Sequence, residues 1–204
     1  VTESEVVSDH PVSAFNHLAD ELVRRGDLKA EFDSGVSKGD TVELDLDWEL
    51  SPLSDVGAIM SAMLRHALQN PSSMAAGEPP IGLIAQLIDG TASGPAVLEA
   101  DEPDLGRILV LFDRDNFRVE NALDRIEGGA SVLGQVEKVV GEDRFYSLQP
   151  LLTPGLNRAV RRSLSVNAID ELLEKMEPLL GRPMSTQDLQ VDGPAVVVRA
   201  VAIY

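Results

Sequence analysis

The chain has 204 residues, of which 44% are hydrophobic but only 4% aromatic, so its core must be built mainly from aliphatic side chains. It has no cysteine, which excludes disulfides, thiolate metal sites and cysteine nucleophiles. Its net charge is −17, most of it in the first half of the chain, and this disfavours binding to nucleic-acid phosphates.

The first predicted elements are an amphipathic helix and a strand. We expect the helix between Pro11 and Gly26, because proline suits a first helical turn and glycine suits a helix end. In the segment 41–50, TVELDLDWEL, apolar and acidic residues alternate strictly from Val42 to Leu50. This pattern predicts a strand with one buried and one solvated face, which is typical of an antiparallel sheet.

Two more helices are predicted before the middle of the chain. Their apolar residues recur at helical spacing from Val56 to Leu64 and from Ile81 to Ile88. The loop 70–80 between them is rich in proline, serine and glycine, and a boundary would fall there if the two halves were separate units. We expect instead a single domain over residues 1–204.

The second half of the chain predicts strands joined by tight turns, followed by one more helix and a last strand. The last strand, PAVVVRAVAIY, is apolar on both faces, which places it centrally in a sheet. The expected elements are a hairpin of 96–100 with 107–112, a turn and short helix at 113–125, a hairpin of 131–140 with 144–148, a helix at 169–176 and a strand at 194–204. Together these elements predict an α+β fold, with a mostly antiparallel sheet and several packing helices.

Two groups of acidic residues invite a search for catalytic or metal chemistry. On the first strand, the solvated face carries Glu43, Asp45, Asp47 and Glu49, but neighbours on one strand face lie about 7 Å apart, too far for adjacent carboxylates to share an ion comfortably. Asp113 and Asp115 follow a buried strand, where carboxylates often bind metals, yet ion pairing or helix capping by Asp115 explains them without a reaction. We therefore predict no catalytic residue, no metal site and no cofactor.

Arg199 is the single charge in the apolar last strand. An unpaired buried charge is costly, so this side chain must reach solvent or find a carboxylate. Asp113 and Glu137 are candidate partners for an ion pair, and we prefer that interpretation to the binding of an anionic ligand.

A basic cluster downstream is the best candidate for a binding surface. Arg158, Arg161 and Arg162 fall on roughly one helical face, with Asn157 beside them, in a protein that is otherwise acidic. Phosphate groups or an acidic partner would suit such a surface. Pairing of these arginines with the acidic first half explains the cluster equally well.

Four segments of the chain together resemble a bacterial domain-of-unknown-function family that is common in actinobacteria. They are DTVELDLDWELSP, ILVLFDRDNFRVENALDRIEGGASVLGQVEKVV, LLTPGLNRAVRRSL and GPAVVVRAVAIY. The resemblance extends from about Val12 onward and implies that the two halves of the chain belong together. It implies no activity, and by the same comparison this chain lacks an N-terminal segment that relatives carry.

The preferred functional hypothesis is a non-enzymatic cytoplasmic binding or regulatory module that uses the arginine cluster to engage an anionic partner or small molecule. A metal-assisted hydrolase or transferase that uses Asp113 and Asp115 is one alternative, and a structural homo-oligomer is the other. No membrane association is expected, because no window holds the roughly 18 apolar residues that a membrane span needs.

Overall fold

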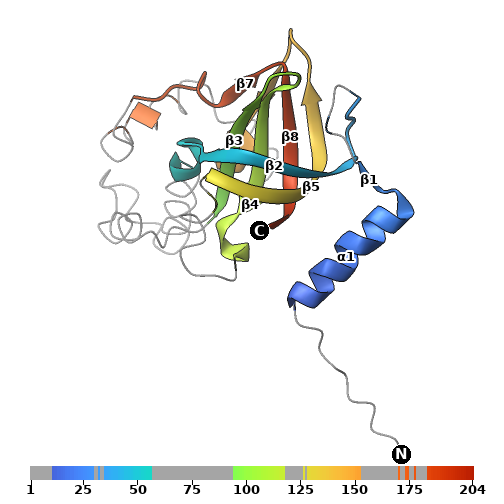
Figure 1. The fold of residues 1–204 in the computed structure, drawn as a ribbon. Helices are drawn as coiled ribbons and strands as arrows, with labels where there is room; N and C mark the ends of the chain where they lie inside the picture. The colour runs from blue at the N-terminus through green and yellow to red at the C-terminus, as the bar shows by residue number, and fades with distance from the viewer. Residues whose placement is uncertain are drawn as a thin grey trace, which may run out of the picture.

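The computed structural model describes residues 11–29, 32, 35–56, 94–117, 126, 128–152, 170, 173–174, 177 and 183–204. The helix expected from Ile81 to Ile88 and the loop 70–80 lie outside these residues, as does most of the helix expected from Val56. Figure 1 shows a barrel of β-strands with one long helix, α1 (Pro11–Arg25), standing beside it. The positive φ of Gly26, 71°, ends this helix where the sequence predicts.

Five strands close the barrel, and each is bonded to two neighbours. Their order around the barrel is β2, β3, β4, β8 and β5, and β5 then pairs with β2. The bounds are Thr41–Leu50 for β2, Pro95–Glu102 for β3, Gly106–Asp113 for β4, Gly128–Val140 for β5 and Ala195–Ile203 for β8. A short strand β1 (Leu28–Lys29) adds in parallel to the start of β2.

The strand directions identify the architecture. All neighbours in the barrel are antiparallel except β4 and β8, which are parallel. The third and fifth strands of the barrel are therefore side by side, and the fourth returns to pair with the first. This is the Greek-key arrangement of the five-stranded OB-fold barrel. The connection from β4 to β5 begins with the 3-10 helix η2 (Arg114–Asn116), and Phe117 and Ile126 of this connection pack against the barrel core.

The predicted α+β fold with several packing helices is wrong. Among the described residues the helices of four residues or more are α1, the turn at 53–56 and α5 (Gln149–Leu152), whereas strands dominate. The sheet closes because β2 is long and curved enough to serve two partners. It pairs with β5 from Thr41 to Trp48 and with β3 through Glu49 and Leu50.

The predicted strands are mostly in place, but one predicted pairing is wrong. The strand at 41–50 and the hairpin of β3 with β4 are confirmed, and the last strand is central, between β4 and β5. The expected hairpin of 131–140 with 144–148 does not form. Instead β6 (Phe145–Ser147) pairs with β7 (Gln190–Asp192), a strand from much later in the chain.

The inside of the barrel is one of two hydrophobic cores that the described residues form. Trp48 is its largest buried side chain, and its Nε1–H donates to the carbonyl of Ala130 on β5 at 2.8 Å, so the polar edge of the indole is satisfied. Aliphatic side chains fill the remaining space, as the low aromatic content requires. They include Val42, Leu44, Leu98, Ile108, Val110, Val132, Val136, Val196 and Val198.

Helix α1 is attached to the barrel through the end of the chain. The ring of Phe15 packs against that of Tyr204, with centroids 4.9 Å apart. Tyr204 in turn extends β8, because its backbone N–H and carbonyl bond to Ser131 of β5 at 3.0 and 2.9 Å. The Tyr204 hydroxyl also donates to the Glu43 carboxylate on β2.

Two bulges bend β5 against β8. The pairing steps over Val201 on β8 and over Glu137 on β5, so neither residue has a partner across the strands. Gly134 lies between the two irregularities. A Cβ at this position would meet the Val198 side chain and would lie 2.8 Å from the carbonyl oxygen of Arg199. The two strands approach so closely there that only glycine fits.

Replacing Gly134 with alanine should therefore weaken the barrel. We expect the free energy of unfolding to fall by about 1–3 kcal/mol, as for other overpacked cores, with a lower melting temperature in calorimetry. Gly141→Ala is the matched control, because a Cβ there meets nothing within 4 Å. Equal melting temperatures for the two variants would contradict the close approach.

Candidate functional site

The outer face of β3, β4 and β8 is not open to solvent, because a second hydrophobic core covers it. In OB-fold barrels the corresponding face of the second and third strands, with the loops beside it, is where ligands commonly bind. Here Val97, Leu109, Leu111 and Val197 point outward from these strands into the second core. The residues that cover them are Leu53, Val56, Leu148, Leu173, Met184, Leu189 and Val191.

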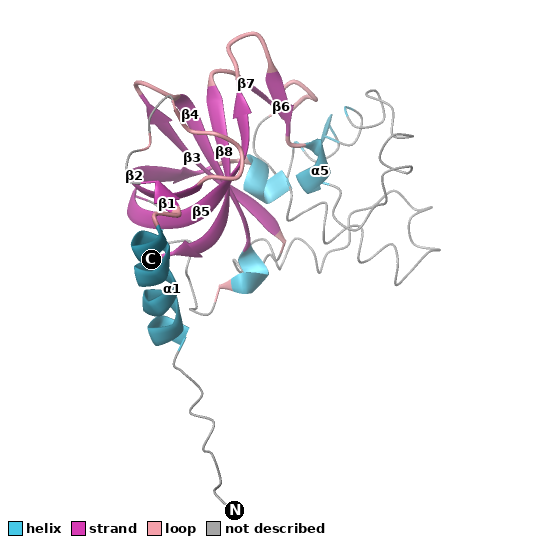
Figure 2. Ribbon diagram, turned by 90° about the vertical axis from the view of Figure 1, so that its right-hand side faces the viewer, coloured by secondary structure: helices cyan, strands magenta, loops and turns pink. Residues whose placement is uncertain are grey.

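The cover comes from the two connections that flank this face. Leu53 and Val56 follow β2, and the other covering residues belong to the connection from β5 to β8, which contains β6, α5 and β7. Figure 2 shows β6, β7 and α5 gathered on one side of the barrel. The chain itself therefore occupies the area that a ligand would use, and candidate sites lie at the margins of this cover.

A polar network marks one margin. Arg199 donates to Glu137 Oε2 from Nε at 3.1 Å and from Nη2 at 2.7 Å, so the predicted ion pair with Glu137 is confirmed and Asp113 is not the partner. The Tyr146 hydroxyl donates to the other oxygen, Oε1, at 3.1 Å. Glu137 reaches both groups because the bulge releases it from the regular pleat.

The arginine of this network remains accessible. Its side chain is 61% exposed, so solvent screens the pair and its contribution to stability is small. Tyr146 is half-buried and packs against the second core. Burial first, and then the Glu137 charge, raise the pKa of Tyr146 to about 12.

The acidic corner after β4 is organised by backbone contacts. Asp113 Oδ1 accepts a hydrogen bond from the Asp115 N–H at 3.0 Å and caps the 3-10 helix. The predicted cap is thus Asp113 and not Asp115. Arg114 between them turns away to Asp55, with 3.4 Å between Nη2 and Oδ1. Within the described parts of the chain, no three His, Cys, Asp or Glu side chains are grouped so as to hold a metal ion.

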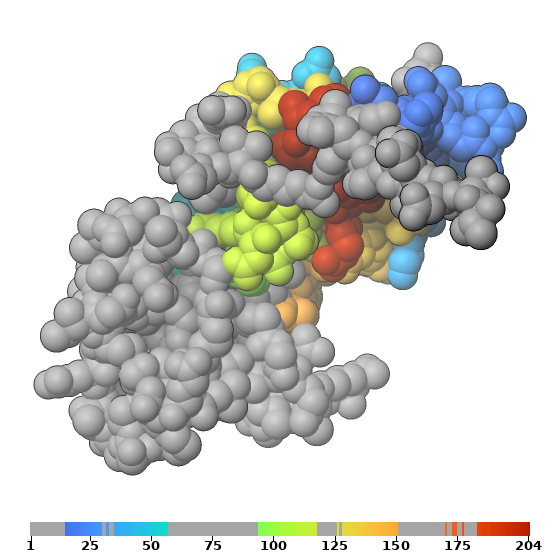
Figure 3. All heavy atoms as spheres, turned by 90° about the horizontal axis from the view of Figure 1, so that it is seen from below, coloured from blue at the N-terminus to red at the C-terminus, as the bar shows by residue number. Residues whose placement is uncertain are grey.

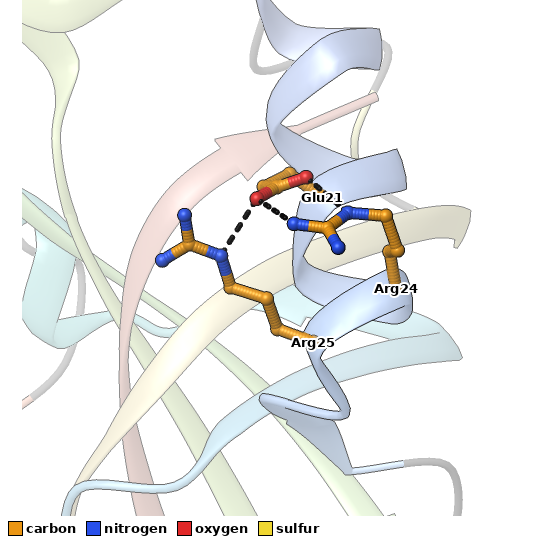
Figure 4. Close-up of polar contacts among 3 residues, drawn as sticks. All are labelled: Glu21, Arg24 and Arg25. Atoms are coloured by element: carbon orange, nitrogen blue, oxygen red, sulfur yellow. Dashed lines mark hydrogen bonds and ion pairs between the residues drawn. The ribbon is translucent and has the colours of Figure 1, made fainter.

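The acidic face of β2 is solvated, as predicted. Glu43, Asp45, Asp47 and Glu49 are all exposed, and the Tyr204 hydroxyl is the hydrogen-bond donor that the structure shows for Glu43. Burial, followed by the Glu43 hydrogen bond and charge, raises the pKa of Tyr204 to about 12. Other surface charges are paired locally on α1, where Arg24 and Arg25 both donate to Glu21 at 2.5–2.7 Å (Figure 4).

The predicted arginine cluster falls outside the described residues. Asn157, Arg158, Arg161 and Arg162 lie in the sequence between Leu148 and Leu173, both of which are buried in the second core. Sequence reasoning missed the role of Tyr146 and the burial of Arg114. The only sequence signal for either was the arginine between two aspartates, which suggested local pairing and gave no sign of Asp55.

Both tyrosines of the chain should titrate late in the folded protein. A raised folded pKa means that folding favours the protonated phenol, so this contribution to stability is complete below the unfolded pKa of about 10 and is lost as the pH rises towards 12. We expect little tyrosinate absorbance near pH 11 in folded protein and full absorbance in denaturant.

The variants Tyr146→Phe and Tyr204→Phe separate the two signals, because each leaves one tyrosine. A midpoint near 10 for the folded Tyr204→Phe variant would show that Tyr146 is not held by Glu137 and burial.

Comparison with known proteins yields a family but no function. No curated protein and no solved structure matches the chain. No helix among the described residues combines the length and apolar character needed to cross a membrane. The sequence matches one family over its whole length, residues 1–204, and the description of that family is a domain of unknown function. The predicted membership in such a family is thereby confirmed: the chain belongs to the DUF6414 family.

Proposed function

We propose that the protein is a non-enzymatic binding or regulatory module of the cytoplasm that engages an anionic partner through Asn157, Arg158, Arg161 and Arg162. The observation that supports this proposal is the position of the cluster within the connection from β5 to β8. That connection is anchored by Leu148 and Leu173 over the face of the barrel on which OB folds commonly carry ligands. Leu148 and Leu173 thus stand on either side of the cluster in the sequence, and both are buried in the second core.

Charge also favours an arginine cluster as the recognition element. The protein has 34 acidic and 17 basic residues, so an anion is repelled by most of its surface. Three arginines close together in the sequence would offset that repulsion locally, and their planar donors suit carboxylates and phosphates. The partner is thus expected to carry several negative charges within a short distance.

The arginine cluster can be tested by charge reversal. We change Arg158, Arg161 and Arg162 all to Glu and measure binding of a labelled acidic peptide or inorganic polyphosphate by fluorescence anisotropy. The dissociation constant should rise at least about tenfold. The affinity of the variant should also vary less with salt concentration than that of the unaltered protein.

The matched control changes Arg24, Arg25 and Arg144 to Glu, because these exposed arginines make the same change in net charge elsewhere. If the two triple variants lost the same affinity, the loss would be due to net charge and not to the arginine cluster. No binding by the unaltered protein to either probe would remove the proposal.

A metal-assisted enzyme centred on Asp113 and Asp115 has less support. The Asp113 carboxylate is engaged by the Asp115 N–H, and both side chains are exposed at a helix start. A capping aspartate needs no further role.

A homo-oligomer is the second candidate function, and exposed apolar side chains support it. Leu18 and Val23 on α1 are exposed, as are Val201 and Tyr204 at the end of β8, which α1 contacts through Phe15. Apolar residues that gather on one part of a surface often mark an interface. Burial of α1 against a second copy would remove Leu18 and Val23 from water.

A homo-oligomer formed through α1 should dissociate when the exposed apolar residues of this helix are made acidic. Light scattering should give a multiple of the 21.9 kDa monomer, and the double variant Leu18→Glu, Val23→Glu should return it to the monomer mass. Phe145→Glu, at an exposed position on β6, is the control and should leave the mass unchanged. A monomer at high concentration in the unaltered protein would reject the candidate.

A further inference from the structure

Arg114 is buried where three segments of the barrel meet. Its backbone N–H donates to the carbonyl of Gly94, just before β3, at 2.9 Å. Its guanidinium faces Asp55 in the helical turn after β2. That turn is fixed to the barrel by Ser54, whose hydroxyl accepts from the Val97 N–H at 2.8 Å and donates to the Val97 carbonyl at 3.1 Å. Arg114 therefore sits on a rigid frame at the end of β4.

Among the described residues, the charge of Arg114 has few close acceptors. The side chain is only 8% exposed, and its Nε is buried with no hydrogen-bond partner. Asp55, the ion-pair partner seen in the described structure, is 58% exposed and contacts Nη2 at 3.4 Å. A buried cation needs close and well-aligned acceptors to offset its lost hydration, and one long contact does not supply them.

Arg199 shows what a satisfied arginine looks like in the same protein. Its Nε and Nη2 both donate to Glu137, at 3.1 and 2.7 Å, although this side chain is largely exposed. On the equivalent edge of Arg114, only Nη2 donates a hydrogen bond, and that bond, to Asp55, is long. The buried arginine thus retains a free donor on the edge that binds planar oxyanions with two parallel hydrogen bonds.

We propose that Arg114 anchors a binding site for a carboxylate group of a ligand. A carboxylate matches the planar Nε–Nη2 edge and adds one negative charge, whereas a phosphate dianion would add two beside Asp55, Asp113 and Asp115. Asp55 holds the site loosely in the absence of ligand and is displaced by it. This site is distinct from the arginine cluster and does not depend on it.

The location suits a ligand site. The residues that follow β4, coloured yellow-green, form part of the surface seen from below in Figure 3. Asp55 belongs to the connection between the first two barrel strands, one of the loops that flank the ligand face in OB folds. Asp113 does not compete for the guanidinium, because its Oδ1 is taken by the Asp115 N–H.

Acetate is the probe, and the full chain is titrated while the arginine Nε–H resonances are followed by NMR. We expect one buried Nε–H resonance, absent from the Arg114→Lys variant, to shift saturably with acetate. Asp55→Asn keeps the shape of the side chain and removes the competing charge, so it should raise the affinity for acetate about tenfold. Asp143→Asn, on the exposed turn after β5, is the control and should change the affinity less than about twofold.

The acetate titrations can support or overturn the carboxylate site. Saturable binding that strengthens in Asp55→Asn and not in Asp143→Asn supports the site. No saturable shift in either the unaltered protein or Asp55→Asn overturns it, as does equal strengthening in the two aspartate variants. Tighter binding of inorganic phosphate than of acetate overturns the assignment to a carboxylate. If Arg114→Lys fails to fold, the Asp55→Asn comparison still decides, because that variant keeps Arg114.

Discussion

The pairing of β2 with β5 is the constraint on which the rest of the structure depends. Residues 128–135 run along residues 41–48, and this contact converts an open sheet into a closed barrel. Closure removes most of the exposed strand edges and encloses the aliphatic core. The hydrogen bond from the Trp48 indole to Ala130 links the same two strands from within. If β2 and β5 did not pair, the inner core would be exposed to solvent between them.

The closed barrel also explains why the central strands are apolar on both faces. Along β4, Ile108 and Val110 point into the barrel, while Leu109 and Leu111 point out into the second core. The outward side chains need a cover, and the connections before β3 and before β8 supply it. The long connections of this chain therefore contribute to packing as well as joining the strands.

Local structure could be predicted from the sequence, and the barrel could not. The alternation in β2 and the two-faced apolar character of β8 are local patterns, and both strands are where they were expected. Closure depends on the pairing of residues far apart in the chain, on bulges at Glu137 and Val201, and on a glycine at 134, none of which has a periodic signature. Phe145–Ser147 was assigned to the nearest strand because short turns are common, but its partner comes from residues 190–192.

Among the candidate sites, too, contacts with a local signal could be predicted and those that depend on tertiary packing could not. The ion pair of Arg199 with Glu137 was predictable because a charge in an apolar strand demands a nearby carboxylate. Arg114 was assigned to local pairing, since the burial of its side chain depends on a turn that follows a different strand. Burial arises from tertiary packing, and a triplet of charged residues does not encode it.

The contact between Phe15 and Tyr204 has a consequence for how the protein folds. It joins two residues that are far apart in the chain, and β8, which Tyr204 extends, lies between β4 and β5 in the barrel. Contacts between distant residues form slowly, because the chain between them must first be brought together. Closure of the barrel and docking of α1 depend on the same strand, so we expect the two to form together.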